Sequence, residues 1–210
     1  MKIAVIGKGR VGSVLGPAFA KAGHEVVYGV RNPADEKYDN GDEIPHDTTE
    51  GAAQWGEVVI LAVDWGAAES ALAQCGDLSD KILIDCTNPL TMSEAGLELA
   101  LGFDTSAGEI LAVQTDAKLV KTLNQVGSPV MAKAHDFPSR PIQFVAGEDA
   151  EAKTLVSSLL RDIGFEPIDY GGIKNARKME PLGMVWIDQA FQHGMDPETA
   201  WHFLKLADDA

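Results

Sequence analysis

The chain has 210 residues, of which 45% are hydrophobic and 23% are charged, and its formal net charge is −15. This composition suits one globular domain, or one domain with a small appendage, and it argues against a nucleic-acid-binding surface, which needs clustered Lys and Arg. No apolar run is long enough to cross a membrane, so we expect a cytoplasmic protein with no membrane partner. The two cysteines, Cys75 and Cys86, lack metal-ligand spacing and are interpreted as reduced structural thiols, with no metal site.

The first 31 residues follow the order strand, glycine turn, helix, strand. An apolar run at 2–6 stops at Gly7-Lys8-Gly9-Arg10-Val11-Gly12, and a mostly apolar segment then runs to residue 22. In this order the pattern G-x-G-x-x-G is typical of a dinucleotide site. Gly7 lets the chain turn, Gly9 lets a pyrophosphate approach the backbone, and Gly12 lets the helix pack close to the sheet. The N–H groups at the start of the helix favour phosphate, so we predict that a dinucleotide binds here.

The end of the second strand indicates which dinucleotide binds. NAD sites usually carry Asp or Glu about twenty residues after the glycines, to accept hydrogen bonds from the ribose. This chain has Arg31 there, followed by Asn32. A guanidinium suits a 2′-phosphate, so we predict NADP(H). The alternative is that Arg31 is a solvated loop charge.

Strand and helix patterns alternate along the rest of the chain. After a polar loop at 32–47, we expect a short helix at about 48–55 with Thr48 as its N-cap. Buried strands are expected at 57–63, 81–85, 119–123, 142–147 and 165–170, and helices at 65–75, 105–116, 149–163, 173–192 (interrupted or bent at Pro181) and 197–206. The alternation predicts an α/β fold, a Rossmann-type, doubly wound, mostly parallel sheet with a small C-terminal helical portion. We expect residues 1–128 to form an NADP-binding Rossmann domain. Residues 129–210 would form a smaller C-terminal α/β portion that packs on it and provides a dimer face.

In such sheets, ligands lie beyond the carboxyl ends of the strands. That rule selects residues 7–12, Arg31, 63–65, 88–89 and 124–128. We expect these five strand ends to converge on one crevice.

Several further stretches carry a family resemblance. They are Gly23-His24-Glu25-Val26-Val27, Ala62-Val63-Asp64-Trp65, Asp85-Cys86-Thr87-Asn88-Pro89-Leu90, Leu119-Val120-Lys121-Thr122-Leu123-Asn124, Gly171-Gly172-Ile173-Lys174-Asn175-Ala176-Arg177 and Glu180-Pro181-Leu182. With the glycine loop and Arg31, the chain resembles the NADPH-dependent coenzyme F420 reductases, the F420-dependent NADP oxidoreductase family. The order and spacing of the stretches extend the resemblance over essentially the whole chain.

The resemblance implies a homodimer that binds NADP(H) across the strand ends, with a second, flavin-like ring beside the nicotinamide. The implied cofactor contacts are the loop Gly7, Lys8, Gly9, Arg10, Val11 and Gly12 at the pyrophosphate, Arg31 and Asn32 at the 2′-phosphate, Val63 and Asp64 flanking the cofactor, Asn88 near the nicotinamide, and Ser128. The implied substrate contacts are Asn124, Gln125 and Val126. Arg177 either contacts the acidic tail of the acceptor or pairs with an acid of this chain.

Two departures concern the acceptor side. Asp64 stands where relatives often have proline, and Gln125-Val126 differs from the Thr-Ile common in relatives. Hydride transfer between a nicotinamide and a deazaflavin needs no protein nucleophile, so no catalytic residue is assigned. We predict hydride transfer between NADPH and coenzyme F420. The alternatives are an NADPH-dependent reductase of a flavin, a quinone or a small carbonyl compound, and a non-catalytic NADPH-binding redox sensor.

Overall fold

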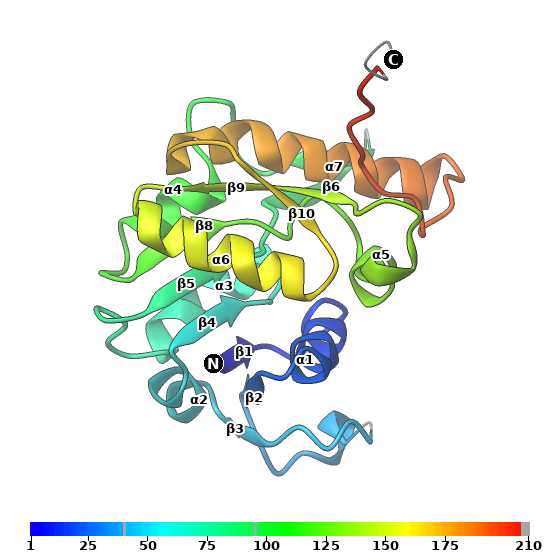
Figure 1. Cartoon of the computed structure of the whole chain (residues 1–210). Coiled ribbons are helices and arrows are strands. Elements are labelled where there is room, and N and C mark those ends of the chain that lie inside the picture. Colours follow the sequence, from blue (N-terminus) through cyan, green and yellow to red (C-terminus); the bar gives the residue numbers. More distant parts are fainter. Residues whose placement is uncertain (40, 95, 207–210) are drawn as a thin grey trace.

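The computed structural model describes residues 1–39, 41–94 and 96–206, which are built around one eight-stranded sheet (Figure 1). The strand order is β10-β9-β8-β5-β4-β1-β2-β3, and every neighbouring pair is parallel except β8 with β9. The strands are β1 (Lys2–Ile6), β2 (Glu25–Val30), β3 (His46–Thr48), β4 (Val58–Leu61), β5 (Ile82–Asp85), β8 (Lys118–Lys121), β9 (Ile142–Gly147) and β10 (Glu166–Asp169). A separate antiparallel pair is formed by β6 (Leu90–Ser93) and β7 (Gly96–Leu99).

Helices cover both faces of the sheet (Figure 1). The helices are α1 (Gly12–Lys21), α2 (Thr49–Trp55), α3 (Trp65–Gln74), α4 (Ala107–Ala112), α5 (Ser128–Ala132), α6 (Ala150–Asp162) and α7 (Ala176–Gln192), with short 3₁₀ turns η1 (Glu36–Tyr38), η2 (Ala134–Asp136) and η3 (Ile173–Asn175). Helices α1, α5 and α6 share one buried cluster, and α2, α3 and α4 share the other. Helix α7 contacts α4 and β7, and it continues across Pro181. Among the described residues, no helix is long and apolar enough to span a bilayer.

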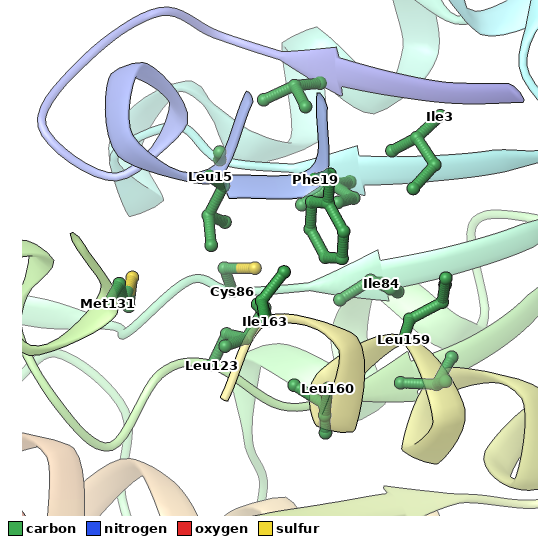
Figure 2. Packing of buried hydrophobic residues seen from close by; sticks show 14 of the residues in the cluster. Ile3, Leu15, Phe19, Ile84, Cys86, Leu123, Met131, Leu159, Leu160 and Ile163 are labelled. Atoms are coloured by element: carbon green, nitrogen blue, oxygen red, sulfur yellow. The ribbon is translucent and has the colours of Figure 1, made fainter. Parts of the chain in front are cut away.

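The side chains of β1 explain why its apolar run is continuous. Ile3 and Val5 point into the cluster under α1 and α6, whereas Ala4 and Ile6 point into the cluster under α2 and α3. A strand buried on both faces needs apolar side chains at every position, since successive residues alternate in direction. Figure 2 shows the first cluster, in which Phe19 of α1 and Leu159 and Leu160 of α6 lie in the same cluster as Ile84 and Ile163.

The predicted fold class is confirmed, and most predicted elements agree with the structure within a few residues. The helix expected at 105–116 is shorter, since α4 ends at Ala112, and β3, α5 and the β6–β7 hairpin were not predicted. Strands β9 and β10 continue the sheet of the first 128 residues, and the domain boundary at residue 128 stays a prediction.

The predicted terminal helix at 197–206 is wrong, because these residues form a turn at 197–198 followed by a segment without regular secondary structure. Asp196 does cap the turn, since its side chain accepts from Glu198 N. The chain then makes tertiary hydrogen bonds in place of helical ones. The Trp186 indole donates to the Thr199 carbonyl at 2.7 Å, and Ile142 N donates to the Trp201 carbonyl at 3.0 Å.

Candidate functional site

A cavity of about 950 Å³ lies at the carboxyl ends of β1, β2, β4 and β5. Its walls include the glycine loop after β1, Arg31 after β2, Val63 and Asp64 after β4, and Cys86 after β5. The chain runs from β1 outward to β2 and β3, then returns to β4 on the other side of β1. Ligands of open α/β sheets bind where the strand order reverses in this way, and the volume is at the upper end of the usual range for ligand pockets, about 300–1,000 Å³.

The glycine loop has the geometry that the sequence predicts. Gly7 has φ +96° and donates its N–H to the Gly29 carbonyl at 2.9 Å. A Cβ at Gly12 would lie 1.9 Å from the Gly7 carbonyl oxygen, so helix α1 can begin this close to the loop only with glycine. A Cβ at Gly9 would have no neighbour within 4 Å, which leaves open space beside the first turn of α1. The loop therefore offers an uncovered backbone and a helix N-terminus to an anion.

Cationic side chains lie at the end of β2. Arg31 and Asn32 are exposed, and Arg31 lines the cavity together with Lys37 and Tyr38 of η1. The Lys37 ammonium is 2.6 Å from an Asp35 carboxylate oxygen. The sequence interpretation missed Lys37 and Tyr38 because it treated residues 32–47 as an undifferentiated loop. The available signal was a lysine six positions after Arg31.

The opposite wall carries Val63, Asp64 and Cys86. Asp64 is exposed at the N-cap position of α3, where its side chain makes no cap hydrogen bond. Trp65, next to it, packs against the core. Cys86 is 8% exposed, and burial raises the pKa of its thiol far above the usual value. A neutral thiol at this position is apolar lining, not a nucleophile.

Asn88 and Asn124 form a reciprocal pair beyond the ends of β5 and β8. Asn88 Nδ2 donates to the Asn124 carbonyl at 2.7 Å, and Asn124 Nδ2 donates to Asn88 Oδ1 at 2.9 Å. Gly183 of α7 packs directly on this pair, because a Cβ there would lie 2.4 Å from the Asn124 carbonyl oxygen. The next residue, Gln125, has its side chain directed into the protein, because it donates to Asn124 Oδ1 and accepts from Phe144 N at 2.7 Å. Val126 is buried, and Ser128 begins α5.

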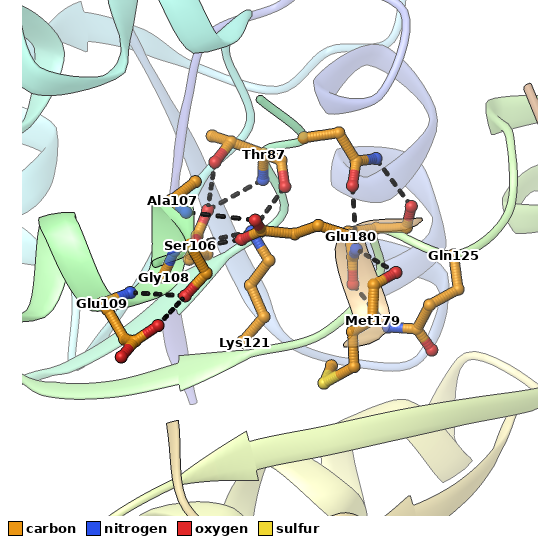
Figure 3. A network of polar contacts seen from close by, with 12 residues as sticks. Thr87, Ser106, Ala107, Gly108, Glu109, Lys121, Gln125, Met179 and Glu180 are labelled. Carbon is orange, nitrogen blue, oxygen red and sulfur yellow. Dashed lines mark hydrogen bonds and ion pairs between the residues drawn. The ribbon is translucent and has the colours of Figure 1, made fainter. Parts of the chain in front are cut away.

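The structure thus brings Asn88, Asn124 and Gln125 together but not onto the cavity wall formed by the glycine loop, Arg31, Val63 and Asp64. Beside them lies a fully buried charge cluster, with Lys121 between two carboxylates (Figure 3). The Lys121 ammonium is 2.8 Å from Asp85 and 3.1 Å from Glu180. Glu180 also accepts from Ala107 N and Gly108 N at the start of α4, each at 3.1 Å. The cluster fixes α7 and α4 to the ends of β5 and β8.

Arg177 pairs with an acid of the chain, which is one of the two interpretations of the sequence. Its Nε and Nη2 atoms donate to the two carboxylate oxygens of Glu109, both at 2.7 Å. The hydrogen bonds from Arg177 lower the pKa of Glu109. This two-point contact joins α7 to α4.

Comparisons with known proteins identify relatives with the same fold. The protein family described as NADP oxidoreductase, coenzyme F420-dependent, matches residues 2–89. A crystal structure from Arthrobacter sp. FB24, assigned as an F420-dependent NADP reductase, is 33% identical with a TM-score of 0.84, and the match covers 92% of this chain and 95% of that one. The hypothetical protein SMa0349 from Sinorhizobium meliloti is 27% identical with a TM-score of 0.73, covering 82% of this chain and 86% of that chain.

Among curated proteins, Metalloreductase STEAP3 from Rattus norvegicus is 28% identical over 182 residues. The match covers 86% of this chain and 36% of the relative. The chain therefore spans about a third of the length of the curated relatives it matches.

Proposed function

Because the chain belongs to the family of coenzyme F420-dependent NADP oxidoreductases, we propose that it transfers a hydride between NADPH and a deazaflavin coenzyme of the F420 type. The observation that carries the proposal is the cavity of about 950 Å³ with the glycine loop on one side and the cations Arg31 and Lys37 at the end of β2. A phosphate-binding backbone and two cations within one crevice are the features that a 2′-phosphorylated dinucleotide requires.

The residues of the crevice fit NADP(H). The glycine loop and the start of α1 would hold the pyrophosphate, and Arg31 and Lys37, with Asn32 beside them, would hold the 2′-phosphate. Val63 and Asp64 would flank the cofactor, and Asn88 would lie at its nicotinamide end. When bound, the nicotinamide supplies or accepts the hydride, and solvent supplies the proton that reduction of the acceptor requires.

The contribution of the chain is orientation and exclusion of water. Cys86, Ala62 and Val63 give the crevice an apolar lining near the ends of β4 and β5. The Asn88–Asn124 pair is held by α7 through Gly183, which limits how far either amide can move. We assign Asn124, Gln125 and Val126 to the acceptor-side wall, with the two amide side chains acting mainly by fixing Asn88. Ser128 is assigned to the cofactor, and Arg177 acts through its pair with Glu109, which joins α7 to α4.

Two measurements test this function. Purified protein is mixed with NADPH and F420, and the deazaflavin absorbance is followed for its NADPH-dependent loss. In parallel, the dissociation constants for NADPH and NADH are measured for the wild type, Arg31→Ala and Lys37→Ala. We expect both variants to weaken NADPH about tenfold or more, the effect of losing one charge-assisted hydrogen bond, and to leave NADH little changed. Lys21→Ala, on the exposed end of α1, is the control.

Equal loss of NADPH and NADH binding in Arg31→Ala would contradict the 2′-phosphate assignment. NADPH binding without hydride transfer to F420, to a flavin or to a carbonyl compound would favour the redox sensor. The predicted homodimer, with residues 129–210 at its face, is part of the proposal, and the mass of the protein in solution tests it.

A flavin is the second candidate acceptor, and Asp64 is the observation that favours it. The exposed carboxylate of Asp64 stands on the crevice wall, at a position where relatives often have proline. A negative charge there repels an acceptor with an acidic tail more than it repels uncharged riboflavin. Faster turnover with riboflavin than with F420, and a selective gain with F420 in Asp64→Asn, would support this candidate.

A further inference from the structure

The side chain of Lys8, at the second position of the glycine loop, turns toward protein groups. It is 2% exposed, and its ammonium lies 2.6 Å from the Tyr38 carbonyl, 3.0 Å from Asp42 Oδ1 and 2.9 Å from His46 Nε2. It also lies 4.6 Å from the centre of the Tyr28 ring. The three partners are 30 to 38 positions away in the sequence.

These contacts use every donor that Lys8 has. A lysine ammonium carries three N–H donors and no acceptor, so each of the three partners must accept. His46 therefore presents an unprotonated Nε2 to Lys8. A phosphate could accept a hydrogen bond from this ammonium only if one of the three existing bonds were broken.

The Lys8 partners belong to one connected cluster, which we call the Lys8 anchor: Lys8, Tyr28, Tyr38, Asp42 and His46. Asp42 Oδ2 accepts from the Tyr28 hydroxyl at 3.2 Å, and Asp42 Oδ1 also accepts from Ile44 N at 3.3 Å. The His46 ring stacks on the Tyr28 ring with centroids 5.6 Å apart. The anchor thereby joins the glycine loop and β2 to the segment between η1 and β3.

The segment held by the anchor carries part of the crevice wall. Tyr38, whose carbonyl Lys8 holds, is the last residue of η1, and Lys37 and Tyr38 both line the cavity beside Arg31. Other hydrogen bonds of η1 are local, from Tyr38 N to the Asp35 carbonyl and from Lys37 N to Asp35 Oδ1. Among the described residues, the side-chain hydrogen bonds that tie Tyr38 and Asp42 to the sheet and the glycine loop come from Lys8 and Tyr28.

We propose that Lys8 is a positioning residue that sets the preference for a 2′-phosphorylated dinucleotide by holding η1, and with it Lys37, beside Arg31. This inference rests on the proposed NADP(H) function of the crevice. Without the anchor, η1 is free to move away from the end of β2, and the two cations no longer converge on one phosphate. The role differs from a direct contact, because a lysine on the pyrophosphate would serve NADPH and NADH alike.

The anchor also makes dinucleotide preference depend on His46. The groups that face His46 are Lys8, Asp42, Tyr28, Tyr38 and Asp39. Burial, and then the charge of Lys8, lower the pKa of His46 below its usual value of about 6.5. Once protonated, His46 would no longer accept from Lys8 and would face it as a second cation. Acid should therefore release η1.

The first experiment compares dissociation constants for NADPH and NADH in Lys8→Met and Asp42→Ala, which removes the oxygen that accepts from Lys8. We expect each variant to weaken NADPH about tenfold and to change NADH less than about twofold, since one charge-assisted phosphate contact is misplaced. Equal weakening of both dinucleotides by Lys8→Met would overturn the proposal in favour of direct pyrophosphate binding. Unchanged NADPH affinity in Asp42→Ala would also count against it. Lys21→Met is the matched control.

A double-variant cycle asks whether Lys8 acts through Lys37. In the Lys37→Ala background, Lys8→Met should cost NADPH affinity much less than it does in the wild type, because its effect is already lost. Additive losses would contradict the proposed route. Thermal unfolding of each variant controls for stability, and Asp42→Ala keeps the test decisive if Lys8→Met does not fold.

The third experiment measures NADPH affinity as a function of pH. This dependence would not change if Lys8 had only a structural role. The 2′-phosphate itself titrates near pH 6, so the informative quantity is the difference between wild type and His46→Gln. A glutamine oxygen can accept from Lys8 but does not titrate, so the variant should keep NADPH affinity at acid pH where the wild type loses it. Identical profiles would refute the role of His46. If Arg31→Ala is selective for NADPH and Lys8→Met is not, this inference fails while the proposed function stands.

Discussion

Replacing Lys121 with methionine tests the buried charge cluster that Lys121 forms with Asp85 and Glu180. Lys121 and Asp85 have fully buried side chains, and the ammonium is held by Asp85 at 2.8 Å, Glu180 at 3.1 Å and the Thr87 carbonyl at 2.5 Å. Methionine fills a similar volume but leaves two buried carboxylates without their cation. Removing one partner of a buried ion pair costs about 3–5 kcal/mol. That is a large part of a total stability of about 5–15 kcal/mol.

Urea unfolding followed by circular dichroism measures this loss. We expect a lower midpoint with an unchanged m value, because the folded state loses stability without a change in the surface exposed on unfolding. Lys118→Met, on the same strand, is the matched control. Lys118 is 46% exposed and pairs with Asp149 at the surface, so its loss should cost less than about 1 kcal/mol.

Two further results test whether the loss of stability comes from the uncompensated buried charges. The double variant Lys121→Met with Glu180→Gln should recover part of the stability, since one of the two uncompensated charges is gone and the glutamine oxygen can still accept from the start of α4. Equal small losses in Lys121→Met and Lys118→Met would refute the reasoning. Burial by itself lowers the pKa of Lys121, but the charges of Asp85 and Glu180 outweigh it and raise the pKa. Its contribution is therefore complete at neutral pH and should decline only above about pH 10, as pH rises toward the folded-state pKa.

Two glycine substitutions test the geometry of the crevice. Gly12→Ala puts a Cβ 1.9 Å from the Gly7 carbonyl oxygen, so helix α1 must shift. Titration with NADPH should then show that binding is largely lost. The control is Gly66→Ala, where the added Cβ meets open space and NADPH should bind normally. Gly183→Ala crowds the Asn124 carbonyl and Asn88 Oδ1, at 2.4 and 2.9 Å, so we expect stopped-flow measurements to show slower hydride transfer with NADPH affinity little changed. The control is Val185→Ala at an exposed position of the same helix. If Gly183→Ala transfers hydride at the normal rate, α7 does not contribute to the site.

The sequence predicts the glycine loop and the buried strands well because their signals are local. Residues 3–6 are all apolar because β1 is buried on both faces, and Gly12 is required by the carbonyl of Gly7, only five positions earlier. The direction of the Lys8 side chain has no local signal, since its partners lie at least 30 positions away. Lys37 was missed although it follows Arg31 by only six positions, because the polar composition of residues 32–47 predicts a loop and gives no sign of the 3₁₀ turn η1 that carries it.

The sequence predictions failed where tertiary hydrogen bonds override the local preference of the residues for a helix or a loop. Asp196 and Pro197 are good helix-start residues, but the chain after them meets hydrogen-bond partners on α7 and β9 that a helix would forgo. Strand β3 has only three residues and depends on pairing with β2, as Tyr28 with His46. The hydrophobic periodicity of the sequence predicts neither feature, because it indicates which residues are buried but not which segment they pair with.

The hydrogen bond from the Trp201 indole to the Gln125 carbonyl has a consequence for the order of events during synthesis. It spans 76 positions and measures 2.9 Å. Domains fold from their N-terminal side as the chain emerges from the ribosome, and contacts of long sequence separation form late. The β1–β2–β4 crevice can therefore assemble, with its dinucleotide, while the wall at Gln125 still waits for Trp201. A nascent chain would bind NADP(H) before the segment at Gln125 takes its final position.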